Sequence, residues 1–248
     1  MSGHSKWATI KHKKGATDAK RAKVFAKLIR QVEVAAREGG ADPEMNPALR
    51  TMFQKARDQS VPLDTIEKAI KRGAGQLEGV AYESITYEGY ASGGVALLVD
   101  VLTDNRNRSG SDVRSVFTKR GGSVAEPGAV AWQFDRKGTM LVDGAVAEDD
   151  LMLAAIDAGA EDITREGDYG RVTTGPTDLH AVRTAVEEAG YKVEESDLTM
   201  VAQNLVTLDD KSAAKKVLDL VDALDDLDDV QAVHGNFDIT DDVLAELG

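Results

Sequence analysis

The chain contains no cysteine among its 248 residues, which excludes disulfide bridges, thiolate nucleophiles and cysteine-ligated zinc. It also lacks an apolar run approaching the roughly 20 residues of a membrane-spanning helix, and no apolar core of a secretory signal follows its basic start. A mitochondrial transit peptide is a closer alternative, but the segment is rich in lysine rather than in arginine and serine. We therefore expect a cytoplasmic protein without membrane contact.

Signatures of nucleotide-binding enzymes and hydrolases are scarce as well. The glycine pairs Gly93-Gly94 and Gly121-Gly122 lack the Gly-Lys-Ser/Thr of a phosphate-binding loop, so we interpret them as turns. No G-x-G-x-x-G motif follows a strand and opens a helix, and no G-x-S-x-G motif marks a nucleophile. These absences predict a protein that is not an enzyme and has no cofactor.

Candidate metal ligands are equally weak. His4 and His12 have no acidic or histidine partner at metal-ligand spacing, and the acidic run 225–229 lacks the central glycine and distal glutamate of a calcium loop. The one enzyme hypothesis that we keep is a metal-dependent phosphate-ester hydrolase using Asp104 and Asp112. We expect no metal site.

Positive charge is scarce over most of the chain and concentrated at one end. Residues 1–72 hold 16 of the 30 Lys+Arg and 8 of the 43 Asp+Glu, a formal charge of +8, which leaves −21 for residues 73–248. A basic region is typical of proteins that bind phosphate, whereas an acidic body repels it. This asymmetry of charge predicts that the partner is a nucleic acid. The alternative is that the acidic excess only favours solubility.

The segment 18–38 is predicted to form an amphipathic helix. Its apolar residues follow the three-and-four spacing of a helix, and Gly39-Gly40 ends it. At about 100° per residue, a second set falls almost opposite the apolar set. This basic set consists of Lys20, Lys23, Lys27 and Arg30. Only Arg21 lies toward the apolar side.

Two more helices should complete a three-helix domain. Asn46 is a good N-cap residue and Pro47 suits the first helical position, so a second helix should begin there. Pro62 should separate it from a third helix over 65–72, and the glycine-rich run 73–79 is predicted to be a linker.

Beyond the linker the spacing becomes typical of strands. Residues 84–90 and 95–104 should form a hairpin, followed by a helix with a capping-box-like pair, Ser109 and Asp112. Residues 129–135 are predicted to be a strand with Val130, Trp132 and Phe134 on one face.

Residues 139–201 show the order strand, helix, strand, strand, helix, strand of the ferredoxin-like fold. The last strand, helix and strand have no partners of their own, so we predict that they complete the sheet that begins near residue 95. The domains are then 1–79, 80–136 plus 202–248, and an insertion at 137–201. The predicted class is α+β, with an N-terminal three-helix domain followed by two interleaved ferredoxin-like α/β domains.

Two groups of residues are candidates for nucleic-acid contact besides the helix at 18–38. The first is the N-terminal arm, in which cations surround an indole that either stacks on a base or pins the arm to the helices. It consists of Lys6, Trp7, Lys11, His12, Lys13 and Lys14. The second is Arg106 with Arg108 at a helix start, which either binds phosphate or forms internal salt bridges with Asp104 and Asp112.

Several stretches resemble the YebC family. They are GHSKWATIKHKKGATDAKRAKVFAKLIRQ, NPALR, IEKAIKRGAG, YEGYASGGVALLVDVLTDNRNR and AVAWQFDRKG, and the similarity spans most of residues 1–140. The resemblance implies a helical N-terminal domain followed by two interleaved α/β domains. It also implies a nucleic-acid function, either as a DNA-binding transcriptional regulator or, as in the mitochondrial relatives and a proposed bacterial role, as a translation factor at the ribosome.

We therefore predict a non-enzymatic, nucleic-acid-binding regulator of gene expression whose target is duplex DNA or ribosomal RNA. A protein-interaction role of the acidic C-terminal helix is an alternative from another class. The lysine-rich arm and helix favour phosphate contact over reading of base edges, which suits an RNA surface, while the family description favours DNA. The sequence leaves the oligomeric state and the target sequence open.

Overall fold

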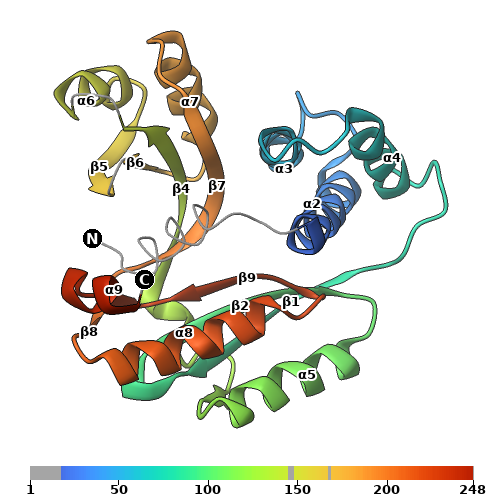
Figure 1. Ribbon diagram of the computed structural model, residues 1–248. Coiled ribbons are helices and arrows are strands. Elements are labelled where there is room, and N and C mark those ends of the chain that lie inside the picture. Colours follow the sequence, from blue (N-terminus) through green and yellow to red (C-terminus); the bar gives the residue numbers. More distant parts are fainter. Residues whose placement is uncertain (1–17, 145–147, 167–168, 248) are drawn as a thin grey trace. The chain divides into compact units, whose positions relative to one another are not determined.

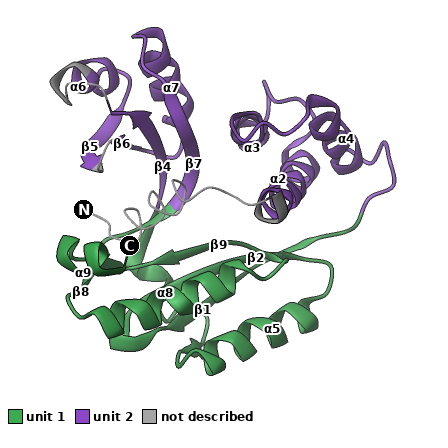
Figure 2. Cartoon of the chain, viewed as in Figure 1, with its two compact units in different colours: residues 1–15, 80–135, 200–248 green, residues 16–79, 136–199 purple. Residues whose placement is uncertain are grey.

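A computed structural model describes residues 18–144, 148–166 and 169–247 (Figure 1). The chain forms two compact units, coloured in Figure 2. Unit 1 contains residues 1–15, 80–135 and 200–248, and unit 2 contains residues 16–79 and 136–199. The domain boundaries given above stay a prediction.

Unit 2 begins with the three predicted helices. They are α2 (Asp18–Gly39), α3 (Pro47–Asp58) and α4 (Leu63–Gly73). Asn46 caps α3 as expected, because its side chain accepts a hydrogen bond from Leu49 N at 3.1 Å. The same side chain donates to the carbonyls of Ala35 at 2.8 Å and Gly40 at 2.9 Å, so one buried amide also fixes the end of α2.

The three helices pack around a small apolar core. Leu28 and Val32 of α2, Leu49 of α3 and Ile66 of α4 are fully or almost fully buried there. A Cβ atom at Gly73 would lie 2.3 Å from the Glu33 carbonyl oxygen, so only glycine lets the end of α4 approach α2 this closely.

The second part of unit 2 is the predicted ferredoxin-like sheet with its two helices. Its elements are β4 (Phe134–Asp143), α6 (Glu148–Ile156), β5 (Ala160–Glu166), β6 (Tyr169–Thr174), α7 (Leu179–Glu188) and β7 (Val193–Ala202). The strand order is β5-β6-β4-β7, and β6 runs antiparallel to both of its neighbours. This order confirms the expectation for residues 139–201.

Unit 1 contains a second four-stranded sheet, in which two consecutive strands precede the first helix. Its elements are β1 (Glu83–Tyr90), β2 (Ala96–Thr103), α5 (Arg106–Lys119), β3 (Ser123–Ala125), β8 (Val206–Leu208), α8 (Lys211–Asp225), β9 (Val230–Gly235), β10 (Phe237–Ile239) and α9 (Asp241–Leu247). The sheet order is β3-β1-β2-β9, so β9 joins the sheet begun by the hairpin. β8 instead pairs with β10 in a separate parallel pair.

The two faces of this sheet are covered differently. α5 and α8 cover one face, where Val99, Phe117 and Leu220 are buried in a common core (Figure 1). Val130 and Phe134 pack with Leu98 on the other face. The predicted hairpin turn is confirmed, since Gly93 and Gly94 both have a φ of 77°, a left-handed value that favours glycine.

Two local predictions were wrong. Residues 131–133 form a 3₁₀ turn rather than a strand, and Trp132 is 67% exposed instead of sharing a buried face. The cause is Glu88, whose buried carboxylate accepts hydrogen bonds from the backbone N–H groups of Gly128, Val130 and Ala131. Those N–H groups are therefore not available to a β-ladder.

The capping box was also placed wrongly. α5 begins at Arg106, and its N-cap is Asn105, whose side chain accepts from Arg108 N at 3.1 Å. Ser109 lies inside the helix, buried, and its hydroxyl donates to Asp229 Oδ2 at 2.6 Å. A serine that resembles a cap in the sequence therefore has a tertiary role.

Candidate nucleic-acid interface

The basic residues of α2 lie on the side of the helix opposite its buried residues. Leu28, Val32 and Ala36 face the core, whereas Lys23 is exposed and Lys27 and Arg30 are partly exposed. Lys20 belongs to the same helical face, but its side chain is outside the described part of the chain. We call Lys20, Lys23, Lys27 and Arg30 the α2 basic face. Arg21 lies toward the apolar side, 5.4 Å from the centre of the Phe25 ring.

A buried carboxylate on α2, which the sequence analysis did not identify, helps to hold the helix in place. Glu33 is 3% exposed and accepts hydrogen bonds from Arg37 at 3.3 Å and from Arg72 of α4 at 2.8 Å. A Cβ atom at Gly79 would lie 2.7 Å from Glu33 Oε1, so the start of the next segment also packs on this carboxylate. The two arginines thus serve the fold.

Two further cations of the helical part were missed, although both are exposed. Arg57 lies in the last turn of α3 and Lys71 in the last turn of α4, and neither forms an ion pair with the residues that the structure describes. Lys68 differs, because it is paired with Asp64 at 2.7 Å. Exposure and pairing, which decide whether a cation can meet a phosphate, depend on tertiary structure.

The predicted arm lies outside the described residues. Its members Lys6, Trp7, Lys11, His12, Lys13 and Lys14 therefore stay predicted contacts.

The two arginines predicted at the start of α5 differ from each other. Arg108 donates to Asp104 at 2.7 Å and to Asp229 at 2.7 Å, so its charge is balanced within the protein. Burial alone would raise the pKa of Asp229, but hydrogen bonds from Arg108, Ser109 and Thr103 outweigh burial and lower that pKa. Arg106 is exposed and has no ion pair with any described residue.

Two ion pairs join α3 to the ferredoxin-like part of unit 2. Arg183 of α7 is 2.7 Å from Asp58, and it also donates to Ser196 at 2.6 Å and Glu187 at 2.9 Å. Lys55 pairs with Asp197. Burial would lower the pKa of Lys55, yet Asp197 holds it above its usual value, so both cations remain charged and structural.

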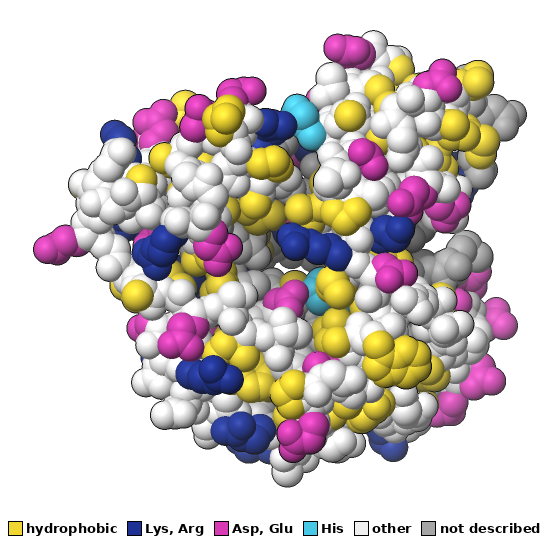
Figure 3. All heavy atoms as spheres, turned by 180° about the vertical axis from the view of Figure 1, so that it is seen from behind, with side chains coloured by type: hydrophobic (Ala, Val, Ile, Leu, Met, Phe, Trp, Pro, Cys, Tyr) yellow, Lys and Arg dark blue, Asp and Glu magenta, His cyan; other side chains and the backbone are white. Residues whose placement is uncertain are grey.

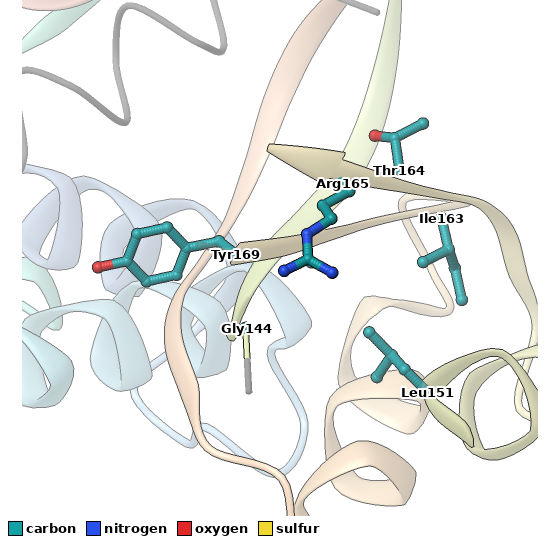
Figure 4. A pocket seen from close by; sticks show the side chains of 7 residues that line it. Gly144, Leu151, Ile163, Thr164, Arg165 and Tyr169 are labelled. Carbon is teal, nitrogen blue, oxygen red and sulfur yellow. The ribbon is translucent and has the colours of Figure 1, made fainter. Parts of the chain in front are cut away.

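The hydrolase hypothesis gains no support from the geometry. Asp104 is engaged by Arg108, and the described residues contain no group of three or more His, Asp or Glu side chains placed to hold a metal ion. A hollow in unit 2, lined by Leu151, Ile163 and Arg165, has a volume of about 20 Å³ (Figure 4). That volume holds about one water molecule and no organic substrate.

Among the residues described, no helix has the length and apolar character needed to cross a membrane.

On the face drawn in Figure 3, basic side chains occur in small groups among acidic ones rather than in one continuous patch. The basic residues that can contact phosphate therefore form separate groups on individual helices.

Comparisons with known proteins identify the family. The model described as TACO1/YebC protein N-terminal domain matches residues 5–76, and the model described as TACO1/YebC second and third domain matches residues 82–237. A protein of Rubrobacter xylanophilus is 56% identical over 249 residues, which cover 100% of this chain and 99% of the relative. A protein of Halothermothrix orenii is 53% identical over 250 residues with the same coverage. Both relatives carry the name probable transcriptional regulatory protein.

The fold has a close counterpart among solved structures. The crystal structure of a conserved hypothetical protein from Aquifex aeolicus is similar with a TM-score of 0.83 and 45% sequence identity, covering 90% of this chain and 93% of that chain. The family models and relatives together cover nearly the whole sequence, and the resemblance noted for residues 1–140 extends beyond them. The chain belongs to the TACO1/YebC family.

Proposed function

We propose that this protein is a non-enzymatic regulator of gene expression that binds nucleic acid through the α2 basic face and the N-terminal arm. The observation that carries the proposal is the position of Lys23, Lys27 and Arg30 opposite the buried side of α2. The names of the relatives support a regulatory role at the level of the family.

The chemistry of this face suits phosphate contact. Lysine is a compact point charge without the planar geometry that reads a base edge, and contacts to phosphate position a protein without reading sequence. Gln31, the one amide of α2, has its side-chain oxygen buried and without a hydrogen-bond partner among the described residues, so that oxygen is not presented to a ligand. We therefore infer that α2 supplies affinity rather than sequence selectivity.

Two considerations bear on which nucleic acid the protein binds, and they favour different targets. The names of the relatives favour duplex DNA as the target of a transcriptional regulator. The predominance of lysine on the α2 basic face, with Arg30 as its one arginine, favours a second candidate, a structured RNA recognised by its shape and phosphates. Only the first candidate requires a strong preference for one duplex sequence.

The test of the proposed contact removes the three described cations. We expect Lys23→Gln/Lys27→Gln/Arg30→Gln to keep the fold and to weaken binding to every sequence. The slope of log K against log salt should fall by about 0.9 for each lost duplex contact, or by about 0.7 on a single strand. The matched control is Lys211→Gln/Lys215→Gln/Lys216→Gln, which removes the same charge from α8. Equal slopes for the two variants would contradict the proposal.

The choice between DNA and RNA needs a competition experiment at physiological salt. A cognate duplex bound about 10³-fold or more tightly than scrambled DNA, without ribosome association, would establish the transcriptional role. Ribosome cosedimentation that is lost with RNase, together with uniform duplex binding, would establish the translational role instead.

A further inference from the structure

α5 is an exception within the acidic part of the chain. Residues 73–248 carry a formal charge of −21, yet α5 and its C-cap contain five cations and one carboxylate. The cations are Arg106, Arg108, Arg114, Lys119 and Arg120. With Arg108 balanced by Asp104 and Asp229, the distribution of the others around the helix decides what α5 can bind.

The two exposed sides of α5 have different chemistry. At 100° per residue, Asn107, Ser111, Arg114 and Thr118 fall within about 60° of one another. Arg106, the first residue of the helix, lies about 80° from Arg114 at the edge of this group. All five are exposed and none is acidic. We call them the α5 polar stripe. The other exposed side carries Arg108, Asp112 and Lys119, so it includes a carboxylate that the stripe lacks.

The surroundings of α5 place the stripe away from the acidic helix. Ser109 and Arg108 reach Asp229, which follows α8, so that side of α5 faces the acidic C-terminal segment. On the stripe side the neighbour is Tyr87 of β1. A Cβ atom at Gly110 would lie 2.8 Å from the Tyr87 hydroxyl and 3.4 Å from Arg114 Nη2, so both groups surround the same point over that glycine.

Neither arginine of the stripe is used by the fold. Arg106 and Arg114 form no ion pair with any residue that the structure describes, in contrast to Arg72, Arg108 and Arg183. Arginine together with Asn, Ser, Thr and Tyr is the set of donors that contacts phosphate oxygens in nucleic-acid complexes.

We propose that the α5 polar stripe is a second phosphate-contacting surface, through which unit 1 binds the nucleic-acid backbone independently of α2. The proposal rests on the proposed function and specifies it further. It also explains how an acidic unit contributes attraction instead of repulsion.

The test uses the full-length chain and two probes, a 30-nucleotide single-stranded RNA and a 30-base-pair DNA duplex. Arg106→Gln/Arg114→Gln should lower the salt slope by about 1.8 on the duplex, or by about 1.4 on the single strand, if both contacts are lost. Arg106→Lys/Arg114→Lys should restore most of the slope, because it retains the two charges. Circular dichroism and the melting temperature verify that each variant is folded.

The control is Lys215→Gln/Lys216→Gln, which removes two charges from α8 of the same unit, where Lys215 lies 3.8 Å from Asp219. A slope for the α5 variant equal to that of this control, while the α2 variant still changes the slope, would overturn the second surface and leave the proposed function intact. If the wild-type chain binds neither probe, both proposals fail.

Discussion

The most deeply buried carboxylates of the two units, Glu33 and Glu88, are balanced in different ways. Unit 2 pairs side chains, since Glu33 accepts from two arginines and Arg183 lies between Asp58, Glu187 and Ser196. Unit 1 also contains a side-chain pair, Arg108 with Asp229, but its buried carboxylate Glu88 is surrounded by three backbone N–H groups. The first arrangement fixes helices relative to neighbouring elements, whereas the second fixes the shape of one loop.

The difference has consequences for substitutions. Removing one partner of a buried ion pair leaves the other charge uncompensated, which costs about 3–5 kcal/mol. Neutralising a carboxylate that backbone groups surround leaves no charge behind, so the loss is limited to weaker hydrogen bonds. Three variants test whether the two units follow these rules.

The largest effect is expected at Arg183. Its side chain is 8% exposed and that of Asp58 is 13% exposed, so Arg183→Met should destabilise unit 2 by about 3–5 kcal/mol. Urea unfolding followed by circular dichroism measures the loss. Arg136→Met, at an exposed arginine without an ion pair in the described residues, should change stability by no more than about 0.5 kcal/mol.

A double variant sharpens this result. Arg183→Met/Asp58→Leu removes both charges and should recover most of the lost stability. If the double variant is as unstable as Arg183→Met alone, lost packing rather than the uncompensated charge of Asp58 is the cause.

A smaller effect is expected at Glu88. Glu88→Gln should cost about 2 kcal/mol, because an amide replaces one acceptor oxygen by a donor and weakens the bonds from Gly128, Val130 and Ala131. Fluorescence in a Trp7→Phe background, where Trp132 is the remaining tryptophan, reports on the loop during urea unfolding.

The pH dependence separates this mechanism from simple packing. Burial would raise the pKa of Glu88, but the three N–H groups outweigh burial and lower the pKa below its usual value. The stabilisation is therefore complete above the unfolded pKa of about 4.3 and is lost as the pH falls through the lower folded value. The gap between wild type and Glu88→Gln should close in acid. A difference in the free energy of unfolding that stays constant down to pH 2.5 would argue against stabilisation by the ionised Glu88 carboxylate.

Local signals predicted the parts of the fold that depend on neighbours in sequence. The helix α2 followed from its period and α3 from Asn46-Pro47, because amphipathic spacing and capping act within a few residues. The errors arose from contacts over long distances in the sequence. Glu88 takes the N–H groups of residues some 40 positions away, and Asp229 binds Ser109 from 120 positions away.

The residues of the candidate site divide in the same way, into those that local sequence signals predict and those that depend on contacts distant in sequence. The α2 basic face was predicted, because basic and apolar residues both follow the helical period and fall on opposite sides of one helix. Of the α5 polar stripe, only Arg106 was predicted, because Asn107, Ser111 and Thr118 carry no charge. Its significance depends on which arginines are paired, and Arg108 acquires its partner Asp229 only through folding.

The smallest effect is expected at Trp132. The alternation of Val130, Trp132 and Phe134 suggests a core tryptophan, and truncating such a residue would cost about 3–5 kcal/mol. Because the side chain is 67% exposed, Trp132→Ala should instead change the free energy of unfolding by no more than about 0.5 kcal/mol. Phe134→Ala, at a residue 5% exposed, is the matched comparison and should show the full core penalty. Thermal unfolding followed by circular dichroism measures both. A loss above about 2 kcal/mol for Trp132→Ala would mean that the indole, rather than Glu88, holds this loop in place.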